Sequence, residues 1–304
     1  TMATIHGKKI KLFSLSSNLP LATEVAEYVG VPLSVCNVQR FADGEVSINI
    51  EETVRGHDVF VIQSTNKPVN DNYIELLIMI DALKRASAQS INVIMPYYGY
   101  SRQDRKAASR QPISAKLMAD LLQAAGATRV LCVDLHADQI QGFFNIPIDN
   151  FRALPILAKY FVDKKIEDVV VISPDHGGTT RARRLADALG APLAIIDKRR
   201  PRPNVAQVMN VIGEVEGMNA VIIDDMVDTA GTLVAAVDML KTKGVKDIYC
   251  CCTHPILSDP AIERITNSDL SELVTTNTIQ LEDYKKACPK MVQLSVAPLI
   301  GQGI

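Results

Sequence analysis

The stretch that decides the fold is Ala220-Val-Ile-Ile-Asp-Asp-Met-Val-Asp-Thr-Ala-Gly-Thr232. Its first four residues are apolar and mostly β-branched, which predicts a buried strand, and the residues from Gly231 onward have the apolar spacing of a helix. A strand that ends in acidic residues, then a small, hydroxyl-rich loop, then a helix is the order that ligand binding at the carboxyl edge of a parallel sheet requires. The segment therefore predicts an α/β unit with a binding site at that edge.

The loop in this stretch has the composition of a phosphate site. Residues 228–232 would surround a phosphate with backbone N–H groups and threonine hydroxyls at the positive end of the following helix. The two carboxylates before the loop could accept hydrogen bonds from adjacent hydroxyls of a ribose ring. The alternative is an acidic strand end with a helix N-cap and no ligand. The predicted sugar-phosphate residues are Asp224, Asp225, Asp228, Thr229, Ala230, Gly231 and Thr232.

Apolar runs that resemble this strand recur along the chain and alternate with helical patterns. Such alternation predicts right-handed βαβ units, mainly parallel twisted sheets flanked by helices, and so the α/β class. The predicted strands are residues 59–63, 91–95, 129–133, 168–172, 193–196, 220–223 and 247–250, and the predicted helices are residues 73–84, 114–125, 179–189 and 231–243.

The length of 304 residues suggests two domains. We expect them at residues 5–150 and 151–304, with the last residues as candidates for packing back on the first domain. The boundary rests on residues 146–150, which have the composition of a Pro-bearing polar bridge that leads to a helix starting near Leu154.

Composition narrows the class of protein. Hydrophobic residues make up 47% of the chain and charged residues 22%, as in ordinary globular proteins. A net charge of −2 offers no basic field for nucleic acid, and no run of about 18 apolar residues marks a membrane span. The cysteines lack the CxxC spacing of a zinc or redox site, so Cys132 and residues 250–252 are expected to be buried, reduced thiols. A small-molecule partner and a cytoplasmic location follow.

Two segments of the second half have chemistry suited to anions and metals. Asp197-Lys-Arg-Arg-Pro-Arg-Pro-Asn204 is expected to be an exposed basic loop, in which Lys198 and Arg200 would neutralise a polyphosphate. A solvated basic turn is the alternative. Ser173-Pro-Asp-His-Gly-Gly178 ends another strand, and its Asp175 could hold Mg²⁺.

The first half places further polar residues after predicted strands. His136 follows residues 129–133, although a lone histidine is more often a structural hydrogen-bonding group than a ligand. The cationic residues 102–106 follow another strand end, and Phe41-Ala-Asp-Gly-Glu45 has the composition of a turn that by itself needs no function.

Together these segments resemble the class I ribose-phosphate pyrophosphokinases, whose domains have the type I phosphoribosyltransferase fold. The resemblance implies two similar α/β domains and transfer of the β,γ-diphosphoryl group of Mg-ATP to the C1 hydroxyl of ribose 5-phosphate, giving 5-phosphoribosyl 1-diphosphate and AMP for nucleotide biosynthesis. It also implies a homohexamer and a closure of the two domains on their substrates.

The resemblance assigns roles to individual residues. Lys198 and Arg200 would be catalytic, Arg200 would also contact ribose 5-phosphate, and His136 and Asp175 would hold Mg²⁺. The ATP-binding residues would be Asp43, Gly44, Glu45, Arg102, Gln103 and His136, with the first three reaching the adenine from a neighbouring subunit.

Departures from the family pattern concern regulation. Arg110 and Gln141 match positions around a regulatory nucleotide site, but the sequence ends at Leu299-Ile-Gly-Gln-Gly-Ile304, where relatives usually continue. Two rival functions stay open: a phosphoribosyltransferase that consumes the diphosphate, and a non-catalytic regulatory homologue. Neither rival needs the basic loop at Lys198 together with the ATP-binding segments of the first half.

Overall fold

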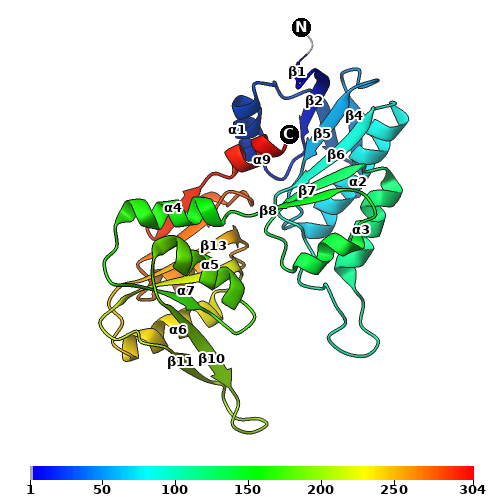
Figure 1. Cartoon of the computed structure of the whole chain (residues 1–304). Helices are drawn as coiled ribbons and strands as arrows, with labels where there is room; N and C mark the ends of the chain where they lie inside the picture. The colour runs from blue at the N-terminus through cyan, green and yellow to red at the C-terminus, as the bar shows by residue number, and fades with distance from the viewer. Residues whose placement is uncertain (1–2) are drawn as a thin grey trace. The chain divides into compact units, whose positions relative to one another are not determined.

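The computed structural model describes Ala3 to Ile304 and divides into two units, each built on its own sheet (Figure 1). The first unit contains the described residues up to Arg152 together with Thr278–Gln280 and Ser295–Ile304, and the second contains Ala153–Asn277 and Leu281–Leu294. The predicted α/β class with mainly parallel sheets is confirmed. In the part of the chain from Ala3 onward, no helix is long and apolar enough to cross a membrane.

The first unit's sheet has the order β1-β2-β5-β6-β7-β8, and every neighbouring pair is parallel except β1 and β2. Its strands are β1 (Thr4–Ile5), β2 (Lys8–Ser14), β5 (Asp58–Ile62), β6 (Ser90–Met95), β7 (Arg129–Val133) and β8 (Ile148–Phe151). The other elements of this unit are the hairpin β3 (Cys36–Arg40) and β4 (Val46–Ile50), α1 (Leu19–Val29), α2 (Val69–Arg85), α3 (Ser114–Ala125), the 3-10 helix η1 (Asp138–Phe143) and α9 (Ala297–Gly303).

The second unit's sheet has the order β11-β10-β9-β12-β13-β14-β15, with one antiparallel pair, β10 and β11. Its strands are β9 (Val169–Ser173), β10 (Leu193–Arg199), β11 (Val208–Ile212), β12 (Asn219–Val227), β13 (Ile248–Pro255), β14 (Glu272–Thr276) and β15 (Met291–Leu294). The helices are α4 (Leu154–Lys164), α5 (Thr179–Leu189), α6 (Gly231–Thr242), α7 (Ala261–Thr266) and α8 (Asp283–Lys286).

Each face of the second sheet has its own core, because side chains alternate along a strand. Cys250 and Cys252 pack with α6 and α7 on one face, and Cys251 packs with α4 and α5 on the other. All cysteines of the chain are free, and Cys132 and residues 250–252 are buried, as expected. The consecutive thiols therefore serve packing on both faces of β13.

The observed elements differ from several of the predicted segments. Residues 146–150 are not a bridge, since Ile148–Phe151 form the edge strand β8, where Asp149 pairs with Arg129 at 2.5 Å. Edge strands tolerate such polar residues because one side meets solvent. The strand predicted at residues 220–223 continues through Val227, and the predicted loop at residues 197–204 begins inside β10, whose last residues pair with β11.

Candidate active site

The predicted phosphate loop joins β12 to α6 at the carboxyl edge of the second sheet. Ala230 is the residue before α6 and has a left-handed backbone with φ of 64°, although it is not glycine. This conformation costs an alanine about 1–2 kcal/mol, so the surrounding fold must hold it. The first N–H groups of α6 have no partner within the helix and carry its positive dipole end. The loop thus has the backbone of an anion site.

A cavity of about 180 Å³ opens on this loop. It brings together predicted residues from the ends of β9, β10 and β12. Its lining consists of Pro174, Asp175, Lys198, Ile222, Asp224, Met226, Val227, Asp228, Thr229, Ala230, Gly231, Thr232, Leu233, Ala236 and Cys250. Two predicted residues, Asp225 and Arg200, are not among them: Asp225 is buried, and Arg200 follows β10 as an exposed residue.

The two adjacent carboxylates of β12 have different surroundings because the strand continues past them. Successive side chains of a strand point to opposite faces, so Asp224 lines the cavity while Asp225 is only 5% exposed. The backbone N–H of Asp225 donates to Asp224 Oδ1 at 2.8 Å, and Arg181 Nη1 lies 4.0 Å from the same oxygen. Burial, and then the charge of Asp225, raise the pKa of Asp224 well above its ordinary value.

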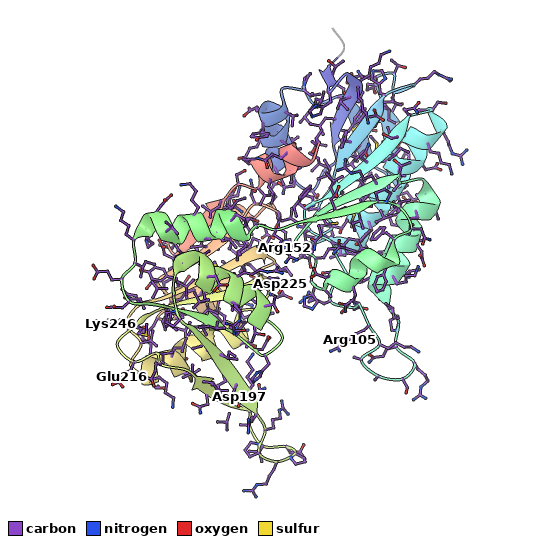
Figure 2. The ribbon with its side chains drawn as sticks, viewed as in Figure 1. Arg105, Arg152, Asp197, Glu216, Asp225 and Lys246 are labelled. Carbon is purple, nitrogen blue, oxygen red and sulfur yellow. The ribbon has the colours of Figure 1, made fainter. Side chains whose placement is uncertain are left out.

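A carboxylate on β10 contacts the loop that follows β9, beside the cavity. Asp197 Oδ1 lies 3.0 Å from His176 Nε2, and Asp197 Oδ2 accepts from Arg199 Nε at 2.7 Å. The hydrogen bond to His176 is the main cause that lowers the pKa of Asp197. Because strand residues alternate, Lys198 lies on the opposite side and lines the cavity. Figure 2 shows Asp197 on the arm formed by β10 and β11.

Asp175 is held in its loop by one of its own oxygens. Its Oδ1 accepts the backbone N–H of Gly178 at 2.8 Å, just before α5 begins. The carboxylate lines the same cavity as Asp224 and Asp228. Among the residues from Ala3 to Ile304, no group of three or more His, Cys, Asp or Glu side chains could hold a metal ion. A metal here would need further ligands from water or substrate, as is usual for Mg²⁺.

The predicted ATP residues all belong to the first unit. Asp43, Gly44 and Glu45 form the exposed turn between β3 and β4, where Gly44 has a φ of 95° and the N–H of Glu45 donates to Asp43 Oδ1 at 3.0 Å. Arg40, the last residue of β3 before this turn, pairs with the buried Glu75 of α2 at 3.1 Å. The hairpin is therefore tied to the body of the unit while its tip faces solvent.

The other first-unit residues follow the adjacent parallel strands β6 and β7. Arg102 and Gln103 lie in the loop from β6 to α3, where Figure 2 labels Arg105, and Gln103 Oε1 accepts from Ser114 at 2.6 Å. His136 is an exposed residue just after β7. The carboxyl ends of adjacent parallel strands lie at one edge of a sheet. Of the two predicted regulatory residues, Arg110 is exposed in the β6–α3 loop and Gln141 lies in η1.

Three polar residues at the second-unit site were not predicted. Arg181 was overlooked although it lies on the first turns of a predicted helix that begins at the sheet edge. No sequence pattern marked His176 or Arg264 as site residues. For Arg264 the reason is distance along the chain, because its 3.0 Å hydrogen bond from Nη1 to Thr229 O joins residues 35 positions apart.

The two halves match different family models. Residues 10–126 match the N-terminal domain of ribose phosphate pyrophosphokinase, and residues 152–282 match the phosphoribosyl transferase domain. A ribose-phosphate pyrophosphokinase of Bacillus caldolyticus is 63% identical over 296 residues, which cover 97% of this chain and 94% of that protein. One from Corynebacterium ammoniagenes is 62% identical over 298 residues, covering 98% and 94%. The crystal structure of phosphoribosylpyrophosphate synthetase from Mycobacterium smegmatis has a TM-score of 0.92 at 44% identity and covers 97% of both chains.

Proposed function

Because this chain belongs to the ribose-phosphate pyrophosphokinase family, we propose that it transfers the β,γ-diphosphoryl group of ATP to the C1 hydroxyl of ribose 5-phosphate. The products are 5-phosphoribosyl 1-diphosphate and AMP. The observation that carries the proposal is the cavity of the second unit, which joins Lys198, Asp224 and the phosphate loop in one place.

Ribose 5-phosphate binds in this cavity. The loop of residues 228–232 holds the 5-phosphate with backbone N–H groups at the start of α6 and with the hydroxyls of Thr229 and Thr232. Asp224 accepts hydrogen bonds from the ring hydroxyls, and the neighbouring carboxyl of Asp225 lies buried and outside the cavity lining. A sugar phosphate held at both ends presents its anomeric oxygen in a fixed direction, which is the main requirement of phosphoryl chemistry.

The reaction is a displacement at phosphorus. The C1 oxygen of the sugar forms a bond to the β-phosphorus of ATP, the bond from that phosphorus to the α,β-bridging oxygen breaks, AMP leaves with that oxygen, and the hydroxyl proton is released. Lys198 supplies positive charge to the developing anion from the cavity wall. Arg200, two residues further along the hairpin, supplies a second charge and contacts the sugar phosphate.

The first unit supplies the ATP site. Asp43, Gly44 and Glu45 contact the adenine, in a neighbouring subunit of a homohexamer, while Arg102, Gln103 and His136 lie beside the phosphates. A bound Mg²⁺ would supply further charge neutralisation. Asp175 suits this ion because its carboxylate lines the cavity, whereas His136, the other proposed ligand, offers a nitrogen that Mg²⁺ prefers less than oxygen. The enzyme acts in the cytoplasm, and Arg110 and Gln141 are proposed to belong to a regulatory nucleotide site.

The test is AMP release from Mg-ATP with and without ribose 5-phosphate, followed by the mass of the sugar product. The proposal expects AMP only when the sugar is present, in equal amount to a pentose that carries three phosphoryl groups. Folded protein that releases no AMP, with inorganic phosphate also tested, would identify a regulatory homologue. Diphosphate release from added 5-phosphoribosyl 1-diphosphate and a nucleobase, without sugar-dependent AMP, would identify a phosphoribosyltransferase.

A further inference from the structure

The segment from the end of β13 to α7 packs behind the phosphate loop and holds three successive residues, the last of β12 and the first two of the loop. The N–H of Leu257 donates to Val227 O at 3.0 Å, and the N–H of Ser258 donates to Asp228 Oδ1 at 3.4 Å. Arg264 Nη1 donates to Thr229 O at 3.0 Å. Of these contacts, the one from Arg264 is the only one made by a side chain of the supporting segment.

Arg264 lies on the outer side of the loop. Its side chain lines a surface depression between α6 and α7, together with Asp238 and Glu263, and it does not line the cavity. In a trans peptide the C=O and the following N–H point in opposite directions. With Thr229 O directed to Arg264, the N–H of Ala230 points away from Arg264, and Ala230 is a residue of the cavity wall. The arginine thus sets which way this peptide faces.

The residue after this peptide bond is the strained one. Ala230 has its left-handed backbone at the point where the loop enters α6, and its side chain is 5% exposed. The guanidinium of Arg264 also lies close to Gly231, because a Cβ atom built on Gly231 would lie 3.1 Å from Arg264 Nη1. A strained backbone persists only where several contacts determine it. Arg264 is one of these contacts and holds the peptide that precedes the strained residue.

We propose that Arg264 is a positioning residue that keeps the Thr229–Ala230 peptide with its N–H available to the 5-phosphate of the substrate. The inference rests on the proposed function, because it concerns the same sugar-phosphate site. Loss of Arg264 lets the peptide rotate toward a relaxed conformation at Ala230, and the phosphate loses a donor. The effect falls on ribose 5-phosphate binding, and turnover at saturating substrate changes little.

The experiment measures ribose 5-phosphate binding by calorimetry, without ATP, for wild type and Arg264→Ala, and KM and kcat for both. The inference predicts that the dissociation constant and KM rise about tenfold, the factor that each 1.4 kcal/mol of lost binding gives, with kcat within about twofold. Arg264→Lys, which keeps one donor, should lose clearly less. Lys243→Ala, which removes an exposed cation beyond the other end of α6, should bind like wild type.

A double variant separates the positioning role of Arg264 from the effect of its charge. Glycine adopts positive φ without strain, so Ala230→Gly combined with Arg264→Ala should recover most of the lost affinity. No recovery, together with a loss that shrinks in high salt, would mean that Arg264 acts only as a charge and would overturn the inference. Unchanged ribose 5-phosphate binding by Arg264→Ala would also overturn the inference. If Arg264→Ala does not fold, Arg264→Lys replaces it, and a loss of affinity no greater than that of Lys243→Ala would overturn the inference. Wild-type protein that does not bind ribose 5-phosphate would contradict the proposed function instead.

Discussion

Asp224 is the residue at which stability and binding oppose each other. A carboxyl with a raised pKa holds its proton more tightly in the folded protein than in the unfolded chain. Folding is then favoured most below the ordinary aspartate pKa of about 3.9, and the stability declines as pH rises toward the folded value. Burial and the charge of Asp225 are the causes of the shift. The stability that a protonated Asp224 contributes is therefore lost as pH rises toward about 8, where the group becomes the carboxylate that the sugar hydroxyls would meet.

Asp224→Asn should remove this pH dependence. We expect the variant to melt close to wild type at pH 4 and about 2 °C or more above it at pH 8, the minimum shift that large domains show for about 1 kcal/mol. Ribose 5-phosphate binding should weaken at least about tenfold, because an amide accepts sugar hydroxyls less well than a carboxylate. Melting curves at both pH values measure the first effect. Asp238→Asn, at an exposed position of α6, is the control, and equal Tm differences at both pH values would contradict the prediction.

Lys198→Ala tests the charge on the cavity wall. Removing a cation that acts on the transition state should lower kcat by about a hundredfold or more while leaving the ribose 5-phosphate dissociation constant within about threefold. Steady-state kinetics and calorimetry measure the two quantities separately, and Lys243→Ala is the matched control. A parallel loss of binding and turnover would show that Lys198 holds the substrate in its ground state.

At the residue scale, the sequence predicted most of the cavity but not its supports. Lys198, Asp224 and residues 228–232 belong to short motifs whose chemistry can be recognised locally, and they do meet in one cavity. The burial of Asp225 could not be predicted because it depends on how far β12 continues. Arg264 and the His176–Asp197 contact join segments that only the folded chain brings together.

Among the elements, the hairpin of β10 and β11 explains how the basic segment is presented. Asp197 to Arg199 pair with residues 208–210, so the cations begin on a strand and continue into the turn. The run of apolar residues at 193–196 predicted the first part of β10. The last residues of the strand, Asp197 to Arg199, are charged, so no apolar pattern marks them as part of a strand. The hairpin of β3 and β4 was recognised only by its turn, residues 41–45, although Val46-Ser-Ile-Asn-Ile50 alternates apolar and polar residues as a half-buried strand does.

The connection from β6 to α3 depends on Gly99. A Cβ atom there would lie 2.3 Å from Thr65 O, a backbone atom that cannot move cheaply, and the N–H of Gly99 donates to Thr65 Oγ1 at 2.8 Å. Gly99→Ala should lower the free energy of unfolding by about 1–3 kcal/mol and weaken ATP binding through the nearby Arg102 and Gln103. Urea unfolding measures the loss. Gly142→Ala, where no atom lies within 4 Å of the new Cβ, should change stability much less, and equal effects would contradict the prediction.

At the scale of the whole molecule, strand and helix alternation predicted two parallel sheets, because each βαβ unit is local in the sequence. The path of the last residues is not local: Thr278–Gln280 and Ser295–Ile304 belong to the first unit, where Ser64 donates to Thr278 O at 2.5 Å and α9 packs on α1. The last residues were expected as candidates for packing back on the first domain, but no periodicity predicted that Thr278–Gln280 belong to it as well.

The reaction proposed for this chain transfers a diphosphoryl group by attack of the sugar oxygen at the β-phosphorus of ATP. ATP with ¹⁸O in the bridge between its α- and β-phosphorus tests this in one reaction with ribose 5-phosphate, analysed by mass spectrometry. The claim predicts that the ¹⁸O leaves with AMP and that the sugar gains two unlabelled phosphoryl groups. A sugar joined to the adenylyl group, with the ¹⁸O in released diphosphate, would contradict it, as would AMP formation that does not depend on the sugar.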